Sequence, residues 1–359
     1  MHICFITATM AGGGTERVIA VLANYFVKQN NKITILLTAS DKIEYDLDPQ
    51  IEIIQLGGET GGRLAGRLQR IIRMRNYFRK NRDTVYLSFG TETNMFAILS
   101  AFFMKRKLVV SERNDPNKCT FKKKRDLLYP FAKGFVFQTQ DAMDCFPESI
   151  RKKGLVIPNP VSGNVPERFT GERRKEIIAV GRLEEQKNHK LLIEAYADFA
   201  KVIPDFTLKI YGKGYLKQEL ENYAKELNIA ESVIFADFAK DVLEQIKDSY
   251  MYVLSSDYEG ISNSLLEAVA MGLPVISTDC PIGGSKMLIK DHQNGILVPV
   301  GNRKALADAM IELAEDKEFA NRISIEAAGL KKDYSVEQIA KMWQDVIDKM
   351  QEQSVLDLN

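Results

Sequence analysis

The 359-residue chain is long enough for two domains, each with its own hydrophobic core. Its 45% hydrophobic and 27% charged residues exclude a disordered, collagen-like or coiled-coil protein. The net charge of +1 is unevenly distributed, because residues 1–165 hold 25 Lys and Arg against 15 Asp and Glu, while residues 166–359 hold 24 against 33. We therefore expect the basic first half to face an anionic partner.

The four cysteines show no CxxC pair and no histidine at ligand spacing. Free thiols in a reducing compartment are expected, and a zinc site or disulfide framework is not. The N-terminus does not resemble a signal peptide, and the longest apolar stretch, residues 95–104, is about half a membrane span. These features predict a cytoplasmic protein that is soluble or peripheral to a membrane.

Short β-branched runs alternate with helical patterns through the first half of the chain. The expected strands are 2–7, 32–37, 51–56, 85–89, 108–111 and 135–138. The expected helices are 16–29, 64–81, 92–104, 122–132 and 140–151. This alternation predicts a parallel sheet with helices on both faces.

Residues 157–174 break the pattern with three prolines and two glycines, which is typical of an interdomain linker. The alternation then restarts. The expected strands are 176–180, 207–211, 233–236, 251–254, 274–277 and 295–298, and the expected helices are 191–202, 216–227, 242–248, 262–271, 303–316, 318–331 and 336–350. The predicted architecture is α/β, with two Rossmann-like domains and a cleft between them.

Three loops that follow strands could carry chemistry. Gly12 to Gly14 precede a helix, where glycines let a phosphate approach free N–H groups, but a flexible turn explains them equally well. Arg182 and Lys187 follow a strand and could converge on one anion, although such a pair is usually surface charge. Glu259 and Glu267 stand eight apart around a helix start, where a carboxylate could accept ribose hydroxyls, although spacing alone favours two surface glutamates.

The chain resembles the family 4 retaining glycosyltransferases of GT-B fold. Three segments carry the resemblance: GGGTER (12–17), VGRLEEQKN (180–188) and EGISNSLLEAVAMGLPVISTD (259–279). The likeness spans nearly the whole chain, and it is nearest to bacterial enzymes that extend capsular, O-antigen or other glycans on a polyprenyl-diphosphate lipid. It implies an acceptor and membrane-side domain over 1–160, a nucleotide-sugar donor domain over 161–335, and a helix over 336–359 that packs back toward the first domain. It also implies a location on the inner face of the plasma membrane.

The resemblance implies a role for each matching residue. Arg182 and Lys187 would hold the donor diphosphate, with Gly13 and Gly14 approaching it from the facing domain. Glu267 would bind the ribose, and Arg182, Lys187 and Glu259 would serve catalysis. The remaining donor contacts would be Phe238 and Ala239 near the nucleobase, and Gly260, Ile261, Ser262, Asn263 and Ser264 around the sugar and phosphates.

One position departs from the family pattern. Many relatives carry a histidine near the reacting sugar, where this chain has Arg113, which we expect to contact the acceptor. The three histidines of the chain are scattered, and surface or packing roles are expected for them. Asp46-Leu47-Asp48 resembles a metal-binding DxD but reads as a solvated turn, so no metal cofactor is expected.

The segment 63–82 holds eight basic residues and no acid, beside apolar residues at helical spacing. Such a helix can lie on an anionic membrane, or can simply dock its apolar face on the sheet. We expect Arg67, Arg70 and Arg73 to contact the membrane or the acceptor.

The resemblance therefore predicts transfer of a hexose or N-acetylhexosamine from a nucleotide-diphosphate sugar, UDP-linked, to a lipid-linked glycan. A GT-B nucleotide-sugar epimerase and a non-catalytic nucleotide-sugar-binding subunit remain as alternatives. No nucleic-acid recognition motif is present, so nucleic acid is not an expected partner.

Overall fold

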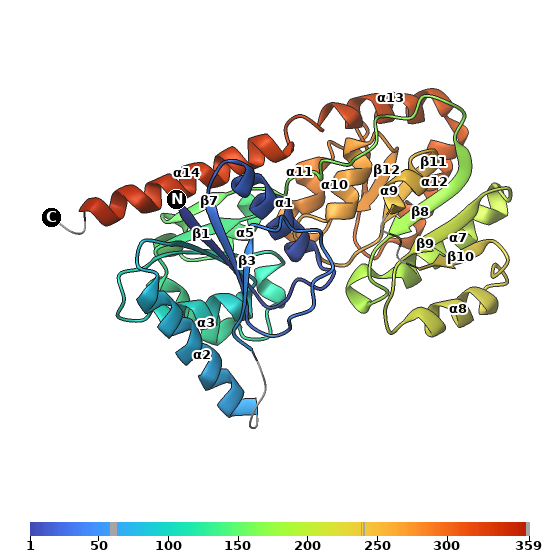
Figure 1. Ribbon diagram of the computed structural model, residues 1–359. Helices are drawn as coiled ribbons and strands as arrows, with labels where there is room; N and C mark the ends of the chain where they lie inside the picture. The colour runs from blue at the N-terminus through green and yellow to red at the C-terminus, as the bar shows by residue number, and fades with distance from the viewer. Residues whose placement is uncertain (58–62, 238, 240, 357–359) are drawn as a thin grey trace. The chain divides into compact units, whose positions relative to one another are not determined.

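The computed structural model describes residues 1–57, 63–237, 239 and 241–356. Contacts within the chain divide it into two compact units (Figure 1). The first unit comprises Met1–Pro160 and Val336–Asn359, and the second comprises Val161–Ser335. Each unit is built around one parallel β-sheet, as the alternating pattern predicted.

The sheet of the first unit has seven strands in the order β3-β2-β1-β4-β5-β6-β7, all parallel. The strands are β1 (His2–Thr7), β2 (Lys32–Leu37), β3 (Glu52–Gln55), β4 (Val85–Phe89), β5 (Lys107–Ser111), β6 (Gly134–Phe137) and β7 (Gly154–Val156). The helices are α1 (Gly14–Lys28), α2 (Arg63–Lys80), α3 (Thr91–Ala101), α4 (Lys122–Leu128), α5 (Gln140–Asp144), α6 (Glu148–Arg151) and α14 (Val336–Leu356), with 3-10 turns η1 (Pro116–Lys118) and η2 (Tyr129–Phe131).

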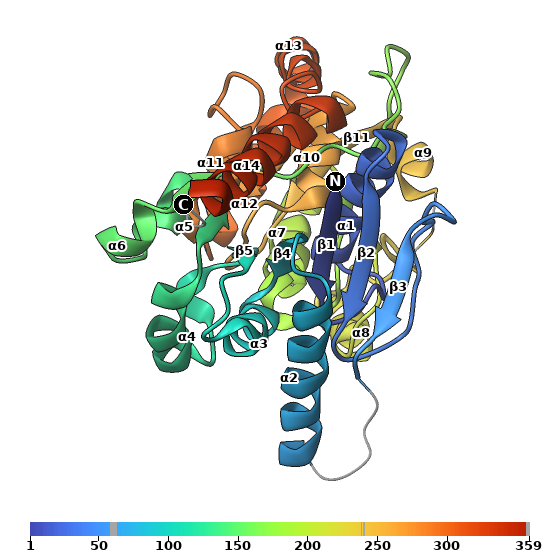
Figure 2. The same ribbon diagram turned by 60° about the vertical axis from the view of Figure 1, so that its left-hand side comes forward.

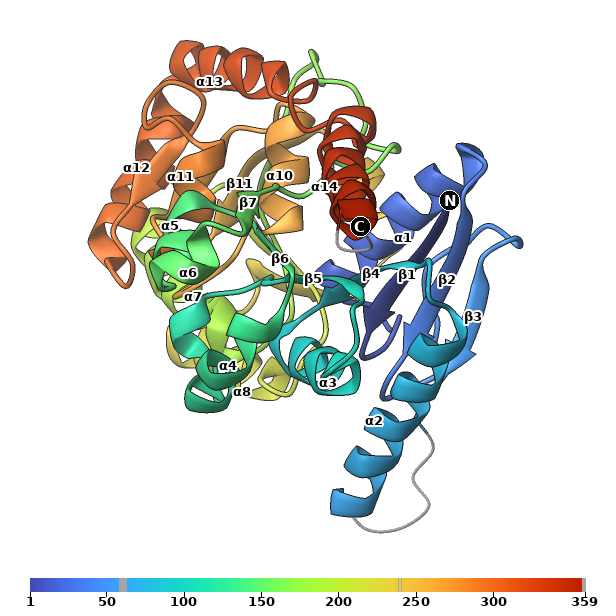
Figure 3. The ribbon, with the colours of Figure 1, turned by 90° about the vertical axis from the view of Figure 1, so that its left-hand side faces the viewer.

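Helices cover both faces of this sheet because the strands are apolar on both sides. Figure 3 shows α1 and α14 on one face and α2, α3 and α4 on the other. Trp343 of α14 is fully buried, and its ring lies 5.4 Å from that of Phe89 in β4. The last helix is therefore part of the core of the first unit, although 175 residues of the second unit separate it from the rest in sequence.

The sheet of the second unit has six strands in the order β10-β9-β8-β11-β12-β13, also all parallel. The strands are β8 (Arg174–Val180), β9 (Thr207–Tyr211), β10 (Val233–Ala236), β11 (Ser249–Leu254), β12 (Val275–Thr278) and β13 (Ile296–Val298). The helices are α7 (His189–Val202), α8 (Lys217–Glu226), α9 (Val242–Ile246), α10 (Asn263–Ala270), α11 (Gly284–Leu288), α12 (Arg303–Glu315) and α13 (Lys317–Gly329), with 3-10 turns η3 (Glu185–Lys187) and η4 (Pro281–Gly283). Two hydrophobic clusters fill its two faces.

Some predicted helices were wrong in detail. The helix expected over 140–151 is two short helices, α5 and α6, because Pro147 lies between them and caps the second. The helix expected over 92–104 ends at Ala101, because the backbone of Phe102 turns to an extended conformation and that of Phe103 is left-handed. Strand β7, of three residues, and helix α11, of five, were not predicted.

Candidate active site

The second unit has a topological switch point between β8 and β11. The chain runs from β8 outward to β9 and β10, then crosses to β11 on the other side of β8. The loops that follow the carboxyl ends of two such strands diverge, and open α/β sheets bind ligands in the crevice that results. The loop after β8 contains Arg182 and Lys187, and the loop after β11 contains Glu259 and leads into α10.

Hydrogen bonds join these two loops to each other. The Gln186 amide donates to the Tyr258 carbonyl at 2.9 Å, and the Asn188 amide donates to the Asp257 carboxylate at 2.7 Å. The Ser255 hydroxyl donates to the carbonyl of Lys187 at 3.0 Å. The side chains that extend from the loops are therefore held on a fixed backbone frame.

Lys187 and Glu259 form a buried ion pair at this edge of the sheet. The Lys187 Nζ lies 2.6 Å from the Glu259 Oε1, and both side chains are about one-tenth exposed. The Ser256 hydroxyl donates to the same carboxylate at 2.9 Å. A Cβ on Gly181 would lie 3.1 Å from the Lys187 side chain, so glycine leaves the room that the lysine uses to reach Glu259. The pair places one cation and one carboxylate together at the sheet edge.

Helix α10 begins beside this ion pair. Ser262 precedes the helix without a side-chain capping hydrogen bond, and its hydroxyl lies 3.1 Å from that of Ser264. The Ser264 hydroxyl donates to the Val180 carbonyl at the end of β8, at 2.9 Å. The positive end of the α10 dipole is thereby fixed next to β8, and it can stabilise an anion.

Glu267 is buried on the second turn of α10. Its Oε1 accepts a hydrogen bond from the Ser162 hydroxyl at 3.1 Å. Ser162 lies in the segment read from sequence as a linker, so periodicity gave no signal for it. This contact shows the buried Glu267 carboxylate accepting a hydrogen bond from a hydroxyl group.

The other residues expected to bind the donor have varied environments. Arg182 is 59% exposed and forms an ion pair with Glu184 at 3.0 Å, whereas Lys187 forms its ion pair with Glu259. Gly260, Ile261 and Asn263 lie in or next to the α10 entry loop. Ala239 follows β10, and its carbonyl accepts a bond from the Val242 amide at 3.3 Å. Phe238 lies outside the described residues.

Gly13 and Gly14 lie in the first unit, where α1 begins after β1. The carbonyl of Gly13 accepts a hydrogen bond from the Tyr45 hydroxyl at 2.7 Å. A Cβ on Gly13 would lie 2.0 Å from a carboxylate oxygen of Glu16, so a larger residue there would require the Glu16 side chain to move. The switch point of the first sheet falls between β1 and β4, beside this turn.

Arg113 follows β5 at the same edge of the first sheet. Its guanidinium bonds the Asn159 amide oxygen and, at 3.4 Å, the Ser111 hydroxyl, and it stacks 5.6 Å from the centre of the Phe89 ring. These contacts are neutral, and burial lowers the pKa of the Arg113 guanidinium to about 9. Such a cation gains from an anionic ligand.

Next to Arg113, sequence reasoning missed a buried polar cluster. The Glu112 carboxylate accepts hydrogen bonds from the hydroxyls of Tyr129 and of Thr91, the latter at 3.0 Å. Burial raises the pKa of Glu112, while the Tyr129 bond and the charge of Arg125 oppose that rise. Tyr129 and Arg125 are distant in sequence from Glu112, so no local pattern could have indicated the cluster.

Helix α2 docks on its sheet and also exposes apolar side chains. Met74 and Phe78 are fully buried, whereas Leu68 and Ile72 are exposed one turn apart. Arg67 lies 3.8 Å from Glu92, and Arg73 donates to the Leu56 carbonyl at 3.1 Å. Arg70 is partly exposed. The two interpretations of this helix are therefore compatible, because docking leaves a basic and partly apolar face in solvent.

His189 is the first residue of α7, two positions after Lys187. Burial, and secondarily the positive charge of Lys187, lower the pKa of the His189 imidazole to about 4. The residue is thus a neutral packing group near pH 7, as expected for the scattered histidines. Within the described residues, no group of three or more His, Cys, Asp or Glu could hold a metal ion.

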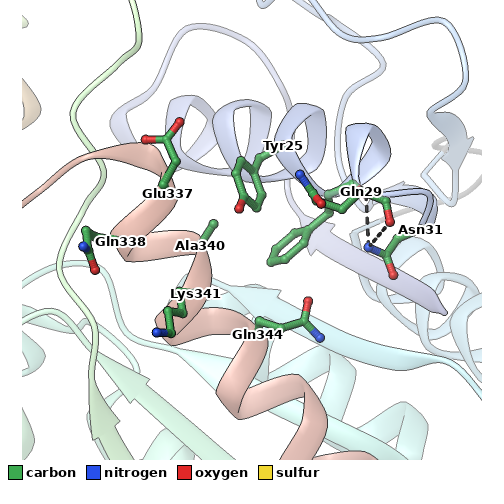
Figure 4. Close-up of a pocket in the computed structure, with 9 residues that line it drawn as sticks. Tyr25, Gln29, Asn31, Glu337, Gln338, Ala340, Lys341 and Gln344 are labelled. Carbon is green, nitrogen blue, oxygen red and sulfur yellow. Dashed lines mark hydrogen bonds between the residues drawn. The ribbon is translucent and has the colours of Figure 1, made fainter.

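A shallow hollow in the first unit lies between the end of α1 and the start of α14 (Figure 4). Tyr25, Gln29, Glu337 and Lys341 line it, and the Asn31 amide there donates to the carbonyls of Phe26 and Gln29. The hollow does not combine an ion pair with a helix N-terminus at the carboxyl edge of a sheet, as the switch point of the second unit does. We therefore locate the candidate site at the switch point.

Comparison with known proteins identifies the class. Residues 165–329 match the family model "Glycosyl transferases group 1". An α-1,4-N-acetyl-D-galactosaminyltransferase of Campylobacter jejuni, named for a GalNAc-containing glycan on undecaprenol diphosphate, is 27% identical over 97% of this chain and 98% of its own. A second transferase of that organism, which acts on a diphospho-undecaprenol-linked glycan by its name, is 28% identical over 90% of this chain and 94% of its own. A solved structure, Anabaena Alr3699/HepE in complex with UDP and glucose, covers 97% of this chain and 99% of its own, with a TM-score of 0.82 and 18% identity.

The fold and these matches define a glycosyltransferase of GT-B fold. The protein is a glycosyltransferase, and the relatives that match nearly its full length include bacterial glycosyltransferases named for undecaprenol-diphosphate-linked glycans. The predicted fold class and enzyme class are confirmed.

Proposed function

We propose that this enzyme transfers a hexose or N-acetylhexosamine from a UDP-sugar, with retention of anomeric configuration, to a polyprenyl-diphosphate-linked or other membrane glycan. The observation that carries the proposal is the switch-point site, where Lys187 and Glu259 lie beside the start of α10. A cation, a carboxylate and a helix N-terminus match the phosphates and hydroxyls of a nucleotide sugar. UDP in the related Anabaena structure supports the choice of nucleotide.

In this proposal each group binds one part of the donor. Lys187, Arg182 and the α10 N-terminus hold the diphosphate, and Glu267 accepts the ribose hydroxyls. Glu259 and the loop through Ser262 contact the sugar. Ala239 lies near the nucleobase.

The reaction breaks the bond between the anomeric carbon and the diphosphate oxygen, and the nucleoside diphosphate leaves with the electron pair. Lys187 and the α10 N-terminus stabilise the charge that grows on that oxygen. The acceptor hydroxyl attacks from the same face and gives its proton to a phosphate oxygen. In this proposal no metal ion is needed at the leaving group, because the cationic groups of the chain stabilise the charge on the diphosphate.

The acceptor side is proposed to lie in the first unit. Arg113 is a partly buried cation with neutral partners, which favours an anionic or hydroxyl-rich acceptor. Arg67, Arg70 and Arg73 of α2 would meet the lipid diphosphate or anionic headgroups. Gly13 and Gly14, although in the first unit, would contact the donor diphosphate. No helix in the described part of the chain has the length and apolarity to cross a bilayer. We propose a peripheral position on the inner face of the plasma membrane.

The test is a donor panel of UDP-, GDP- and ADP-sugars, each with and without a polyprenyl-diphosphate-linked glycan. We expect one UDP-sugar to lengthen the glycan, seen by mass spectrometry. Lys187→Ala should slow transfer about a hundredfold, because it removes one stabilising cation. Lys190→Ala is the matched control, since Lys190 lies three residues away and stacks on Tyr223 instead.

The panel also separates the alternatives. An epimerase would convert a nucleotide sugar without acceptor, and a binding subunit would bind UDP without turnover. Either result would replace the transfer proposal. Transfer from a GDP- or ADP-sugar alone would overturn the choice of nucleobase.

A further inference from the structure

Three phenylalanines form an exposed aromatic cluster on the first unit. The ring of Phe102 lies 4.3 Å from that of Phe103 and 5.0 Å from that of Phe131, both edge-on. Phe103 is 93% exposed and Phe131 is 58% exposed. These rings come from the turn after α3 and from η2, so two separate segments bring them together. We call the three residues the aromatic cluster.

The backbone conformation at position 103 does not favour an aromatic residue, and the Phe103 ring does not pack in the core. Phe103 has a φ of +61°, in the left-handed region that bulky residues avoid and that glycine adopts without strain. The Met104 amide bonds the Ala101 carbonyl at 2.7 Å and fixes the turn. The ring is nonetheless in solvent, where a large apolar group gains little. A strained backbone that presents an exposed aromatic ring points to a partner outside the chain.

Helix α2 holds the turn in place. The Arg75 Nη1 donates to the carbonyls of Ser100 and Phe102, at 3.1 and 2.8 Å. From the turn, the Arg106 Nε donates to the Phe78 carbonyl of α2 at 2.9 Å. α2 and α3 lie side by side on one face of the sheet (Figure 2). The aromatic cluster is therefore fixed to the basic helix.

The charges around the aromatic cluster are positive. Lys105 and Lys133 are exposed, each two residues after a phenylalanine of the cluster, and the Lys153 Nζ lies 3.2 Å from the Pro130 carbonyl. The segments 97–110 and 127–133 contain no acidic residue. Aromatic rings edged by lysines match the interface of an anionic bilayer, where rings enter the headgroup layer and ammonium groups meet phosphates.

We propose that the aromatic cluster inserts into the interfacial layer of an anionic lipid bilayer, while the flanking lysines bind headgroup phosphates. The inference rests on the membrane-borne acceptor of the proposed function, and it adds a contact that the charges of α2 cannot supply. Because ring insertion is apolar, this contact should persist at a salt concentration that screens the arginines of α2.

A tryptophan reporter tests insertion directly. The chain has one tryptophan, Trp343, which is fully buried and out of reach of lipid. We would introduce Phe103→Trp into the full chain and add phosphatidylglycerol–phosphatidylcholine vesicles with brominated acyl chains. The introduced indole should shift to shorter emission wavelength and be quenched. Tyr215→Trp, at a 70% exposed position of the second unit, is the matched control and should stay unquenched.

Removal of the rings provides the second arm. Phe103→Ser with Phe131→Ser should lower vesicle partitioning at high salt by at least about tenfold. Phe103→Gly should retain or raise the melting temperature, because glycine suits the left-handed backbone, and should also weaken vesicle binding. That result would separate membrane contact from folding.

Several results would overturn the proposal. The first is a failure of the unmodified chain to bind vesicles at all. The others are an indole of Phe103→Trp that remains unquenched while the protein is bound, and a double variant that partitions as the wild type does. Conversion of a dimer to a monomer by the double variant, without effect on vesicles, would assign the aromatic cluster to a protein interface. The donor assay runs without vesicles, so its failure would count against the transfer proposal alone.

Discussion

At the scale of single residues, the site depends on carboxylates that are held in place before any ligand arrives. Glu259 is occupied by Lys187 and Ser256, and Glu267 by Ser162. Burying a polar group without partners is costly, so these contacts offset part of the cost of placing the two side chains inside the second unit. A bound donor would offer phosphates to Lys187 and hydroxyls to both glutamates, and these contacts would replace some of the contacts within the chain.

The first prediction concerns Glu267. Glu267→Gln keeps the shape of the side chain and removes the charge that accepts hydroxyls. We expect UDP affinity to fall at least about tenfold, corresponding to about 1.4 kcal/mol or more, with the fold intact by circular dichroism. Isothermal titration calorimetry measures the affinity. Glu219→Gln, at an exposed position of α8, is the control, and equal affinity of the two variants would remove Glu267 from the site.

The second prediction concerns pH. His189 has a folded pKa of about 4, below its ordinary value of 6.5, because burial disfavours the charged ring. The unfolded chain therefore binds more protons between these values, and the free energy of unfolding should fall as the pH drops from 6.5 to 4, by about 3 kcal/mol from this group. Urea unfolding of the wild type and of His189→Leu across that range measures the difference. Parallel pH profiles for the two proteins would contradict the assignment.

At the scale of elements, segments with a continuous apolar run were predictable, and contacts between segments far apart in the sequence were not. The strand over 85–89 was predicted at its observed bounds because five buried residues follow one another there. The pairing of Glu267 with Ser162 was not predictable, since Ser162 lies in an irregular, proline-rich segment and meets α10 only in three dimensions. The Arg75 contacts with α3 were missed for the same reason, because they join a helix to carbonyls 25 and 27 residues later.

The third prediction concerns α2. Arg67→Glu, Arg70→Glu and Arg73→Glu together should lower binding to anionic vesicles at low salt, because each basic residue near such a surface contributes about 1 kcal/mol. They should slow transfer to a lipid-linked acceptor much more than donor hydrolysis. Sedimentation with vesicles at low and high salt measures the first effect.

The control for the α2 variant also replaces three basic residues by glutamate, but on the second unit. Lys225→Glu, Lys304→Glu and Lys317→Glu replace exposed lysines on helices of the second unit. If the α2 variant sediments and transfers as this control does, α2 is only a solvated helix face.

At the scale of the whole molecule, two units with the same order of central strands carry opposite charge. Both sheets follow a 3-2-1-4-5-6 pattern of strands, and each has polar residues at its switch point. Basic residues outnumber acidic ones in residues 1–165, by 25 to 15, and acidic residues outnumber basic ones in residues 166–359, by 33 to 24. The basic excess of the first unit fits our proposal that this unit binds an anionic acceptor, while the donor binds to the second unit.

The fourth prediction concerns metal ions. The proposed site provides Lys187 and the α10 N-terminus where another glycosyltransferase would hold a cation. Transfer should therefore keep its rate in EDTA, measured as UDP release with a saturating acceptor. Loss of activity that only manganese or magnesium restores would contradict the proposed leaving-group chemistry.

The most direct test of the central claim is the structure of the product. The purified chain would be given a UDP-sugar of known anomeric configuration and a polyprenyl-diphosphate-linked glycan, and the new linkage would be read by NMR. We predict a lengthened glycan whose added sugar keeps the configuration of the donor, with activity strongly reduced in Lys187→Ala and retained in Lys190→Ala. A product of inverted configuration, or UDP-sugar consumption that never lengthens the glycan, would contradict the account.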